Sequence, residues 1–234
     1  MEQKDLTGTS TRHLLAPAPR LALALALVCA GALAAGPASA FAGCPNAEVE
    51  VSDQNVAQLE HSVVCLINER RSNAGLPTVR PNAQLEQAAA KHANEMVDQG
   101  FFSHASPNGQ SFIDRITASG YMKDARSWLV GENLGWGSGE YSTPASMVRA
   151  WMESPPHRAN LLRDRFRDLG VAAVRGTPYR AGDPDGVTVS SEYGRRTLSK
   201  KANRKARKAR KARKARKARQ ARRAARKAEA QAEA

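Results

Sequence analysis

Three short motifs decide the fold of this chain. In order along the sequence they are F-F-S-H-A-S-P (residues 101–107), G-E-N-L (residues 131–134) and W-M-E-S-P-P-H-R-A-N-L-L (residues 151–162). Glycine, proline and serine are frequent in and around them, which is typical of turns. The motifs therefore predict that His104, Glu132 and His157 lie in turns rather than inside apolar runs. Two imidazoles and a carboxylate on loops are the groups that a divalent metal site or an acid–base site requires.

The segments around these motifs predict helices first and strands last. Four helices are expected, from near Asp53 or Asn55 to Gly75, from Asn82 to Gly100, from Ser111 to Ser119, and from Thr143 onward. Residues 169–175 and 187–193 are short, partly alternating and β-branched, and they predict two antiparallel strands. The segment near Arg80 and residues 128–130 are candidates for further short strands. This order indicates an α+β fold with helices stacked on a small antiparallel sheet.

Five motifs in this order resemble the bacterial secreted form of the CAP superfamily, also called the SCP or PR-1-like family. They are C-L-I-N-E-R-R, F-S-H-A-S-P, G-E-N-L-G-W-G, W-M-E-S-P-P-H-R-A-N-L-L and S-S-E-Y-G. The resemblance covers roughly residues 63–194 and implies an α-β-α sandwich with a large solvent-facing cleft. We therefore expect a signal peptide (1–40), an N-terminal segment (41–54), a CAP/SCP-like domain (55–195) and a low-complexity tail (196–234).

The resemblance also implies a site. The positions of His104, Glu132 and His157 are cleft residues in this family, and some members bind zinc or another divalent cation there. Glu192 is a candidate fourth residue, and Trp136 is a candidate for the lining of the cleft. Two imidazoles and a carboxylate suit zinc, which accepts nitrogen and oxygen ligands.

Each of the three main candidates also has a purely structural interpretation. His104 would bond to its own turn, Glu132 would accept backbone N–H groups, and His157 would order the start of a helix. The chain departs from the plant and animal members, which have a histidine where Asn68 stands and a G-H-Y-T-Q strand that is absent here. Their four-residue constellation therefore does not carry over whole.

The N-terminus has the features of a secretory signal. Positive charges at Arg12 and Arg20 precede an uncharged apolar run at residues 21–35, and A-S-A at residues 38–40 fits a cleavage site. We expect cleavage and an extracellular, cell-wall-associated protein; a retained anchor or lipidation of Cys44 are the alternatives. The mature chain would keep Cys44 and Cys65, an even pair that predicts one disulfide in an oxidising compartment.

The positive charge of the chain is concentrated at its C-terminus. Residues 195–234 contain 19 Lys and Arg and 2 Asp and Glu, a net charge of +17, whereas residues 1–194 carry −3. The repeat R-K-A has a period of three, which drifts around a helix and leaves no apolar stripe. Repulsion between like charges predicts a disordered tail or a fraying helix. Such a tail is expected to bind anionic cell-wall polymers, lipid headgroups or extracellular nucleic acid, and a solubilising tail without a partner is the alternative.

The sequence leaves two classes of activity open. In the first, a secreted monomer binds a small ligand or a divalent cation and catalyses nothing. In the second, an extracellular hydrolase acts on peptide or cell-wall material with Glu132 or a metal-bound water as base. No G-x-S-x-G motif surrounds Ser103, Ser106 or Ser154, which disfavours a serine hydrolase. We therefore expect a binding protein rather than an enzyme.

Overall fold

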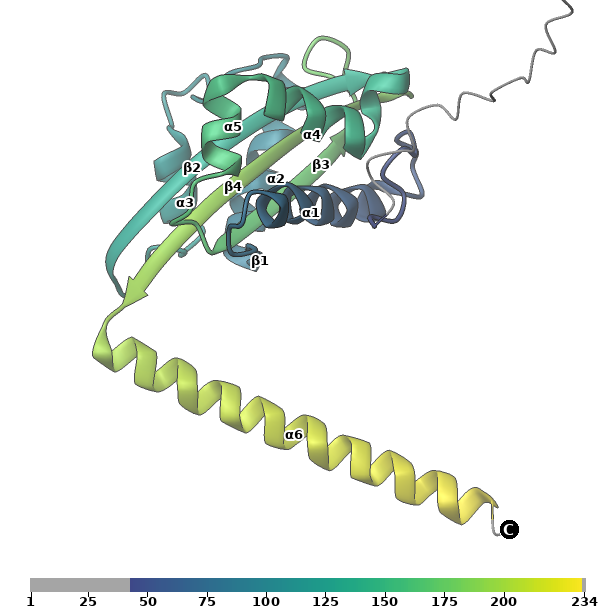
Figure 1. Ribbon diagram of the computed structural model, residues 1–234, viewed down its shortest axis with the longest axis vertical. Coiled ribbons are helices and arrows are strands. Elements are labelled where there is room, and N and C mark those ends of the chain that lie inside the picture. The colour runs from purple at the N-terminus through teal and green to yellow at the C-terminus, as the bar shows by residue number, and fades with distance from the viewer. Residues whose placement is uncertain (1–42, 233–234) are drawn as a thin grey trace, which may run out of the picture. The chain divides into compact units, whose positions relative to one another are not determined.

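The computed structural model describes residues 43–232, so the predicted signal peptide lies outside the described residues (Figure 1). None of the helices within residues 43–232 is long and apolar enough to cross a membrane. The elements, in order, are α1 (Val56–Asn73), β1 (Arg80–Pro81), α2 (Ala83–Gln99), α3 (Phe112–Ala118), β2 (Ala125–Ser138), η1 (Gly139–Ser142), α4 (Pro144–Glu153), α5 (Pro155–Leu161), β3 (Asp168–Arg175), β4 (Gly186–Leu198) and α6 (Lys200–Ala232).

The sheet has four strands in the order β1-β3-β4-β2. β4 pairs antiparallel with both β2 and β3, as the sequence predicts for β3 and β4. The candidate strand near Arg80 is the two-residue β1, which pairs parallel to β3. β2 forms one edge of the sheet, and because side chains alternate along a strand, Glu132 and Trp136 share one of its faces.

Helices cover both faces of this sheet. α2 lies so close to one face that a Cβ atom at Gly170 would come within 2.1 Å of the Glu86 backbone nitrogen. On the other face α4 approaches β2, where a Cβ atom at Gly135 would lie 2.2 Å from Met147 Sδ. Residues of α1 and α4 share the main hydrophobic core on this second face. The predicted α+β fold, an α-β-α sandwich, is confirmed (Figure 1).

The helices begin where the sequence places their caps. The Asn82 side chain accepts hydrogen bonds from the first backbone N–H groups of α2. Ser111 and Asp114 form a capping box at the start of α3. Thr143 caps α4 ahead of Pro144, which is the first helical residue. These side chains satisfy amides that a helix start otherwise leaves unpaired, which is why the pattern is readable from sequence.

The N-terminal segment is fastened to the domain. Cys44 and Cys65 form the predicted disulfide, which links this segment to α1. Ala47 and Val51 are buried in the main core together with Cys44, and Ala47 O accepts a hydrogen bond of 2.8 Å from Ala145 N. The segment is therefore an integral part of the packed structure.

Two of the three motifs lie in regular structure. G-E-N-L falls inside β2, and W-M-E-S-P-P-H-R-A-N-L-L spans the end of α4 and the short helix α5, in whose first turn His157 lies. The prediction that Glu132 and His157 lie in turns is therefore wrong, whereas His104 does lie in the connection between α2 and α3. The glycines of β2 mark close approach rather than a turn: a Cβ atom at Gly131 would lie 2.9 Å from Asn160 Oδ1.

The basic arm, defined here as residues 199–232, is helical, which is the second of the two states that the sequence predicts. Residues Lys200–Ala232 form the helix α6. It starts after Ser199, whose hydroxyl accepts a hydrogen bond of 3.2 Å from Ala202 N. Alanine, lysine and arginine each favour the helix, and this preference accumulates over 33 residues and outweighs the repulsion between like charges.

Candidate histidine site

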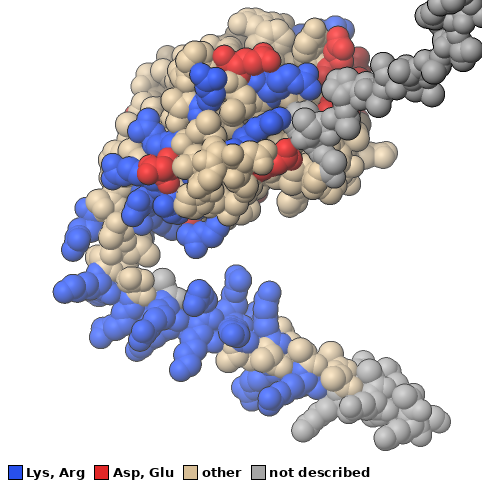
Figure 2. Space-filling view, in the orientation of Figure 1, with Lys and Arg blue, Asp and Glu red and all other residues tan. Residues whose placement is uncertain are grey.

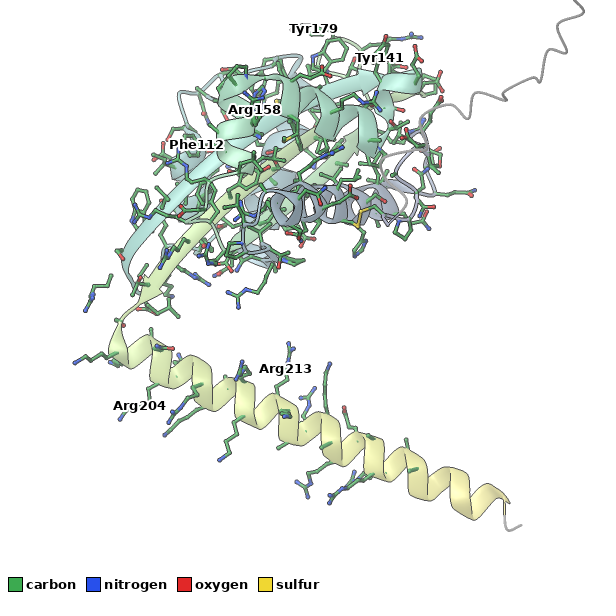
Figure 3. The ribbon with its side chains drawn as sticks, in the orientation of Figure 1. Phe112, Tyr141, Arg158, Tyr179, Arg204 and Arg213 are labelled. Atoms are coloured by element: carbon green, nitrogen blue, oxygen red, sulfur yellow. A yellow bond between two sulfur atoms is a disulfide. The ribbon has the colours of Figure 1, made fainter. Side chains whose placement is uncertain are left out.

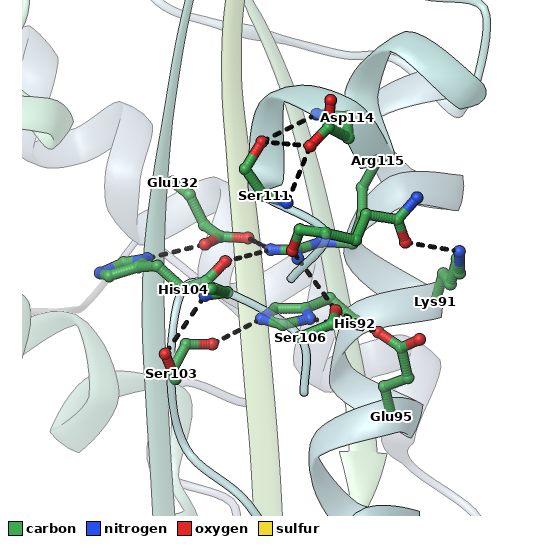
Figure 4. Close-up of polar contacts among 12 residues, drawn as sticks. Lys91, His92, Glu95, Ser103, His104, Ser106, Ser111, Asp114, Arg115 and Glu132 are labelled. Atoms are coloured by element: carbon green, nitrogen blue, oxygen red, sulfur yellow. Dashed lines mark hydrogen bonds and ion pairs between the residues drawn. The ribbon is translucent and has the colours of Figure 1, made fainter. Parts of the chain in front are cut away.

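The connection between α2 and α3, which carries His104, is organised by a buried cation. Arg115 of α3 donates hydrogen bonds to His104 O at 3.0 Å, to Gln110 O at 3.2 Å and to Ser106 Oγ at 3.3 Å. Its side chain is fully buried. A buried guanidinium requires such acceptors because it keeps its charge. The backbone of the F-S-H-A-S-P motif therefore folds around a fixed positive charge (Figure 4).

Glu132 on β2 connects this cation to His104. Glu132 Oε2 accepts a hydrogen bond of 2.7 Å from Arg115 Nη2, and Oε1 accepts one of 2.7 Å from His104 Nδ1. The Glu132 side chain is 1% exposed, whereas that of His104 is 56% exposed. Burial alone raises the pKa of Glu132, but the hydrogen bond from His104 and the charge of Arg115 bring it below its ordinary value. Glu132 is thus an ionised carboxylate that fixes the His104 ring and leaves Nε2 on the side away from it.

His157 is brought to the edge of β2 by two asparagines. Asn133 Nδ2 donates a hydrogen bond of 3.0 Å to His157 O. Asn160 Nδ2 donates to Glu132 O and to Asn133 Oδ1, each at 3.0 Å. Burial lowers the pKa of the half-buried His157, and the charge of nearby His104 lowers it further. The G-E-N-L and H-R-A-N motifs therefore hold each other at the strand that also carries Glu132. We call His104, His157 and Glu132 the histidine site.

Glu192, the candidate fourth residue, lies opposite Glu132 on β4. Its side chain is fully buried, and by geometry neither carboxyl oxygen has a hydrogen-bond partner within residues 43–232. Burial raises the pKa of Glu192 well above its ordinary value, and the Glu132 carboxylate raises it further. The structure thus places Glu192 beneath the histidine site, held toward its neutral form, rather than at the surface.

Two further side chains frame the site. Trp136 lies on the same face of β2 as Glu132 and is 43% exposed. His92 of α2 is fully buried, and its Nε2 forms a hydrogen bond of 2.8 Å with Ser103 O, next to His104. Burial lowers the pKa of His92, so a neutral ring supports the connection from below. A cleft around these residues stays a prediction.

The donor set fits a metal ion only in part. Within residues 43–232 no group of three or more His, Cys, Asp and Glu side chains is arranged to hold one. Both oxygens of Glu132 are engaged by Arg115 and His104, so this carboxylate does not act as a third ligand. The arrangement does match a feature of known metal sites, in which a ligating histidine donates its other ring N–H to a carboxylate. His104 and His157 would then supply the two protein ligands.

Asn68, which stands where the plant and animal members have a histidine, has a different partner. Its side-chain amide donates to Val79 O at 3.0 Å and accepts from Val79 N at 2.8 Å. The amide therefore clamps the segment that precedes β1 and is committed to backbone rather than to a ligand.

Sequence reasoning missed the residues that assemble the site. Arg115, Asn133 and Asn160 carry most of the contacts described above. A charged residue on a short helix is normally solvated, so no pattern in the sequence marks Arg115 as buried. The two asparagines were visible, because each stands inside a motif beside a candidate ligand.

The fold and this network define a class of protein. The α-β-α sandwich is the fold that the five motifs imply, and its edge strand β2 carries a buried glutamate bonded to the histidine between α2 and α3. The family model described as CAP, the cysteine-rich secretory protein family, matches residues 64–193. This match covers more than half of the chain, and the chain therefore belongs to the CAP family.

Curated relatives are found in Bacillus subtilis (strain 168). The chain is 32% identical over 120 residues to the uncharacterized protein YkwD, a match that covers 51% of this chain and 44% of YkwD. It is 28% identical over 116 residues to the uncharacterized membrane protein YlbC, covering 50% of this chain and 32% of YlbC. The chain thus spans less than half the length of either relative.

Solved structures of similar proteins include two bacterial examples. An extracellular protein with an SCP domain from Bacillus anthracis is 25% identical with a TM-score of 0.48, covering 61% of this chain and 43% of that one. An outer surface protein of Borrelia burgdorferi is 20% identical with a TM-score of 0.49, covering 63% of this chain and 98% of that one.

Proposed function

We propose that this CAP-domain protein acts outside the cell as a binding protein whose histidine site takes a divalent cation. The observation that carries the proposal is the 2.7 Å hydrogen bond between His104 Nδ1 and Glu132 Oε1. This hydrogen bond fixes the His104 ring and directs its Nε2 away from the Glu132 carboxylate, toward the exposed side of the ring. Two imidazoles leave the remaining positions of the ion to water or to a bound molecule, which suits zinc because it accepts open positions.

Thermal unfolding in the presence of zinc chloride tests the proposal. Saturating zinc should raise the melting temperature of the parent protein, because an ion that binds only the folded state stabilises it. His104→Ala and His157→Ala should each abolish the shift, and Glu132→Gln should weaken zinc binding about 10- to 100-fold. His61→Ala is the matched control, since His61 is exposed on α1 and its ring bonds to Ala57 O at 2.7 Å. A shift that survives His104→Ala would refute the assignment.

A hydrolase remains the second candidate, but the geometry favours His104 rather than Glu132 as its general base. Glu132 cannot readily serve, because both of its oxygens accept charge-assisted hydrogen bonds. His104 Nε2 would take the proton from water, with Glu132 orienting the ring as the acid of a His–carboxylate pair does. Turnover of a peptide or cell-wall substrate that is lost in both His104→Ala and Glu132→Gln would support this reading. Zinc binding without turnover on any such substrate would leave the binding role alone.

The basic arm is the second functional part, and we propose that it binds a flexible anionic polymer of the cell wall. Helix α6 has 33 residues and would be about 50 Å long at 1.5 Å per residue. Successive alanines of the R-K-A repeat are rotated by about 60° around the axis, so the charges point in every direction. On the face that Figure 2 shows, Lys and Arg side chains extend from both sides of the arm over much of its length. A helix that lies on a membrane requires an apolar face, whereas a flexible polymer can follow charges around a helix.

A variant with a rearranged arm distinguishes binding to an anionic polymer from binding to a membrane. In this variant the residues of the arm are permuted, at constant composition, so that all alanines lie on one face. The parent should bind linear polyphosphate with an affinity that falls steeply with salt, and deletion after Ser199 should remove that binding. The permuted arm should keep polymer binding and gain affinity for vesicles that contain phosphatidylglycerol. If the parent already binds these vesicles as strongly as the permuted arm, the polymer proposal is wrong.

Export is the third part of the proposal. The disulfide between Cys44 and Cys65 supports it, since such bonds persist in oxidising compartments. The N-terminal sequence of the protein recovered from the culture medium would test both export and cleavage after Ala40. Recovery only from the cytosol, with residue 1 intact, would contradict export.

A further inference from the structure

Two aromatic rings form a corner on the surface. Trp136 on β2 is 43% exposed, and Tyr179 in the loop between β3 and β4 is 71% exposed. Their ring centroids are 5.5 Å apart, and their planes meet at 76°. Figure 3 shows Tyr179 at the surface of the domain. Single exposed aromatic residues need no explanation, but two exposed rings in edge-to-face contact form a shaped surface, which we call the aromatic corner.

The aromatic corner is held rigidly. Thr177 and Arg180 close the turn that carries Tyr179 with two backbone hydrogen bonds of 3.1 Å. Pro178, the residue before Tyr179, is buried. Trp136 is fixed by its place in the ladder between β2 and β4. Since neither segment has to be ordered when a ligand binds, part of the entropic cost of binding is avoided.

The size of the aromatic corner decides which occupant fits. With roughly 200 Å² for each full ring, the exposed parts of Trp136 and Tyr179 offer roughly 200 Å². Even with Tyr141 of η1, which is 67% exposed, the total is roughly 350 Å². A stable interface with a second copy of this chain or another protein needs about 800 Å² on each side. Arg180 and Glu140 nearby in the chain are charged and exposed, so the apolar surface does not extend past them.

We propose that the aromatic corner binds a sugar ring of a glycan chain. The C–H groups on one face of a pyranose suit the electron-rich face of an aromatic ring. The hydroxyl groups at the edge of the sugar suit the donors at the ring edges, the indole N–H of Trp136 and the phenol O–H of Tyr179. The corner also lies on the same face of β2 as Glu132, so a glycan that runs along this strand would extend toward His104. The proposal does not depend on a metal ion.

Titration of the purified protein with soluble sugar tetramers tests the proposal. The panel comprises β-1,4-linked N-acetylglucosamine, β-1,4-linked glucose and α-1,4-linked glucose, followed by tryptophan fluorescence and by calorimetry. At least one tetramer should bind saturably, and Trp136→Ala and Tyr179→Ala should each weaken it at least tenfold. Trp128→Ala is the matched control, because Trp128 is 47% exposed on the same face of β2. Its affinity should equal that of the parent.

Three results would overturn the proposal. The first is that no tetramer of the panel binds saturably. The second is that Trp128→Ala and Trp136→Ala lower affinity equally, since the effect would then not come from the corner. The third is a dimer in sedimentation that Trp136→Ala dissociates, which would assign the corner to a second copy. Tyr179 lies in a surface turn, so its variant reports on binding even if Trp136→Ala lowers the melting temperature.

Discussion

Replacement of Arg115 by methionine should destabilise the fold more than any other single change at the histidine site. The Arg115 and Glu132 side chains are 0% and 1% exposed and are joined by a 2.7 Å hydrogen bond. Methionine fills much of the same volume but leaves the Glu132 carboxylate buried without its cation. Removal of one partner of a buried ion pair costs about 3–5 kcal/mol. The backbone acceptors of Arg115 around His104 would lose their donor as well, so we expect about 4 kcal/mol.

Urea unfolding followed by circular dichroism measures this cost in a double-mutant cycle. Glu132→Gln removes the charge but keeps an acceptor for Arg115, so it should cost about 2 kcal/mol. The double variant should cost about as much as Arg115→Met alone, which gives a coupling energy of about 2 kcal/mol. Arg149→Met on the exposed side of α4 is the control and should change stability by less than about 0.5 kcal/mol.

A cost of less than about 1 kcal/mol for Arg115→Met, the size of an ordinary surface effect, would refute the role of Arg115 as a buried cation that holds the site. Additive effects of the two single substitutions would refute it as well, because Arg115 and Glu132 would then not act as one buried unit. Hydrogen exchange of the connection between α2 and α3 gives an independent reading. Its amides should exchange faster in Arg115→Met and keep their parent rates in Arg149→Met, since only Arg115 holds this backbone.

Three other changes probe the sheet and its attachments. The pKa of Glu192 is raised above its ordinary value of 4.5, so the folded state keeps a proton that the unfolded state loses. Stability therefore falls as the pH rises above that value. Glu192→Gln should raise the melting temperature at pH 8 and hardly change it at pH 4. Gly170→Ala drives a Cβ atom to 2.1 Å from backbone and should cost about 3 kcal/mol in urea unfolding, whereas Gly182→Ala, with nothing within 4 Å, should be neutral. Cys44→Ser with Cys65→Ser should cost about 3 kcal/mol. Equal pH profiles of Glu192→Gln and the parent would contradict the first expectation. Equal effects of Gly170→Ala and Gly182→Ala would contradict the second, and an unchanged urea midpoint without the disulfide would contradict the third.

The sequence predicted the parts of the fold that local chemistry encodes. Helix starts were readable at Asn82, Ser111 and Thr143 because a cap is a single side chain that meets its own helix. The disulfide was predicted from Cys44 and Cys65, the even pair that would remain once the predicted signal peptide is removed. Residues 128–130 of β2 were a candidate strand, which the structure confirms, whereas residues 131–134 were read as a turn because of their glycine-rich surroundings. The glycines are there because α4 and α5 come so close to the strand that a Cβ atom would collide, a contact between distant segments that no local pattern contains.

The candidate site was predictable as a set of residues but not as a geometry. The motifs named His104, Glu132 and His157, and the structure brings them to one edge of the sheet. What they did not indicate is the direction of each side chain: Glu132 turns inward to Arg115, whereas His104 is exposed and His157 is half-buried. That distinction depends on Arg115, a buried cation on the short helix that was correctly predicted at residues 111–119 but in which no pattern marked this residue as buried.

The buried charges under the histidine site are explained by how they position Glu132 rather than by a gain in stability. A buried ion pair is no more stabilising than a well-packed apolar pair, so Arg115 and Glu132 are not explained by stability alone. Glu192 adds a further cost, since it is a buried acid without a hydrogen-bond partner in the described part of the chain. What these groups do provide is a carboxylate held at a fixed point, with one oxygen left for His104. An imidazole fixed from behind in this way offers its other nitrogen in a single orientation, which is the property that a cation site and a base share.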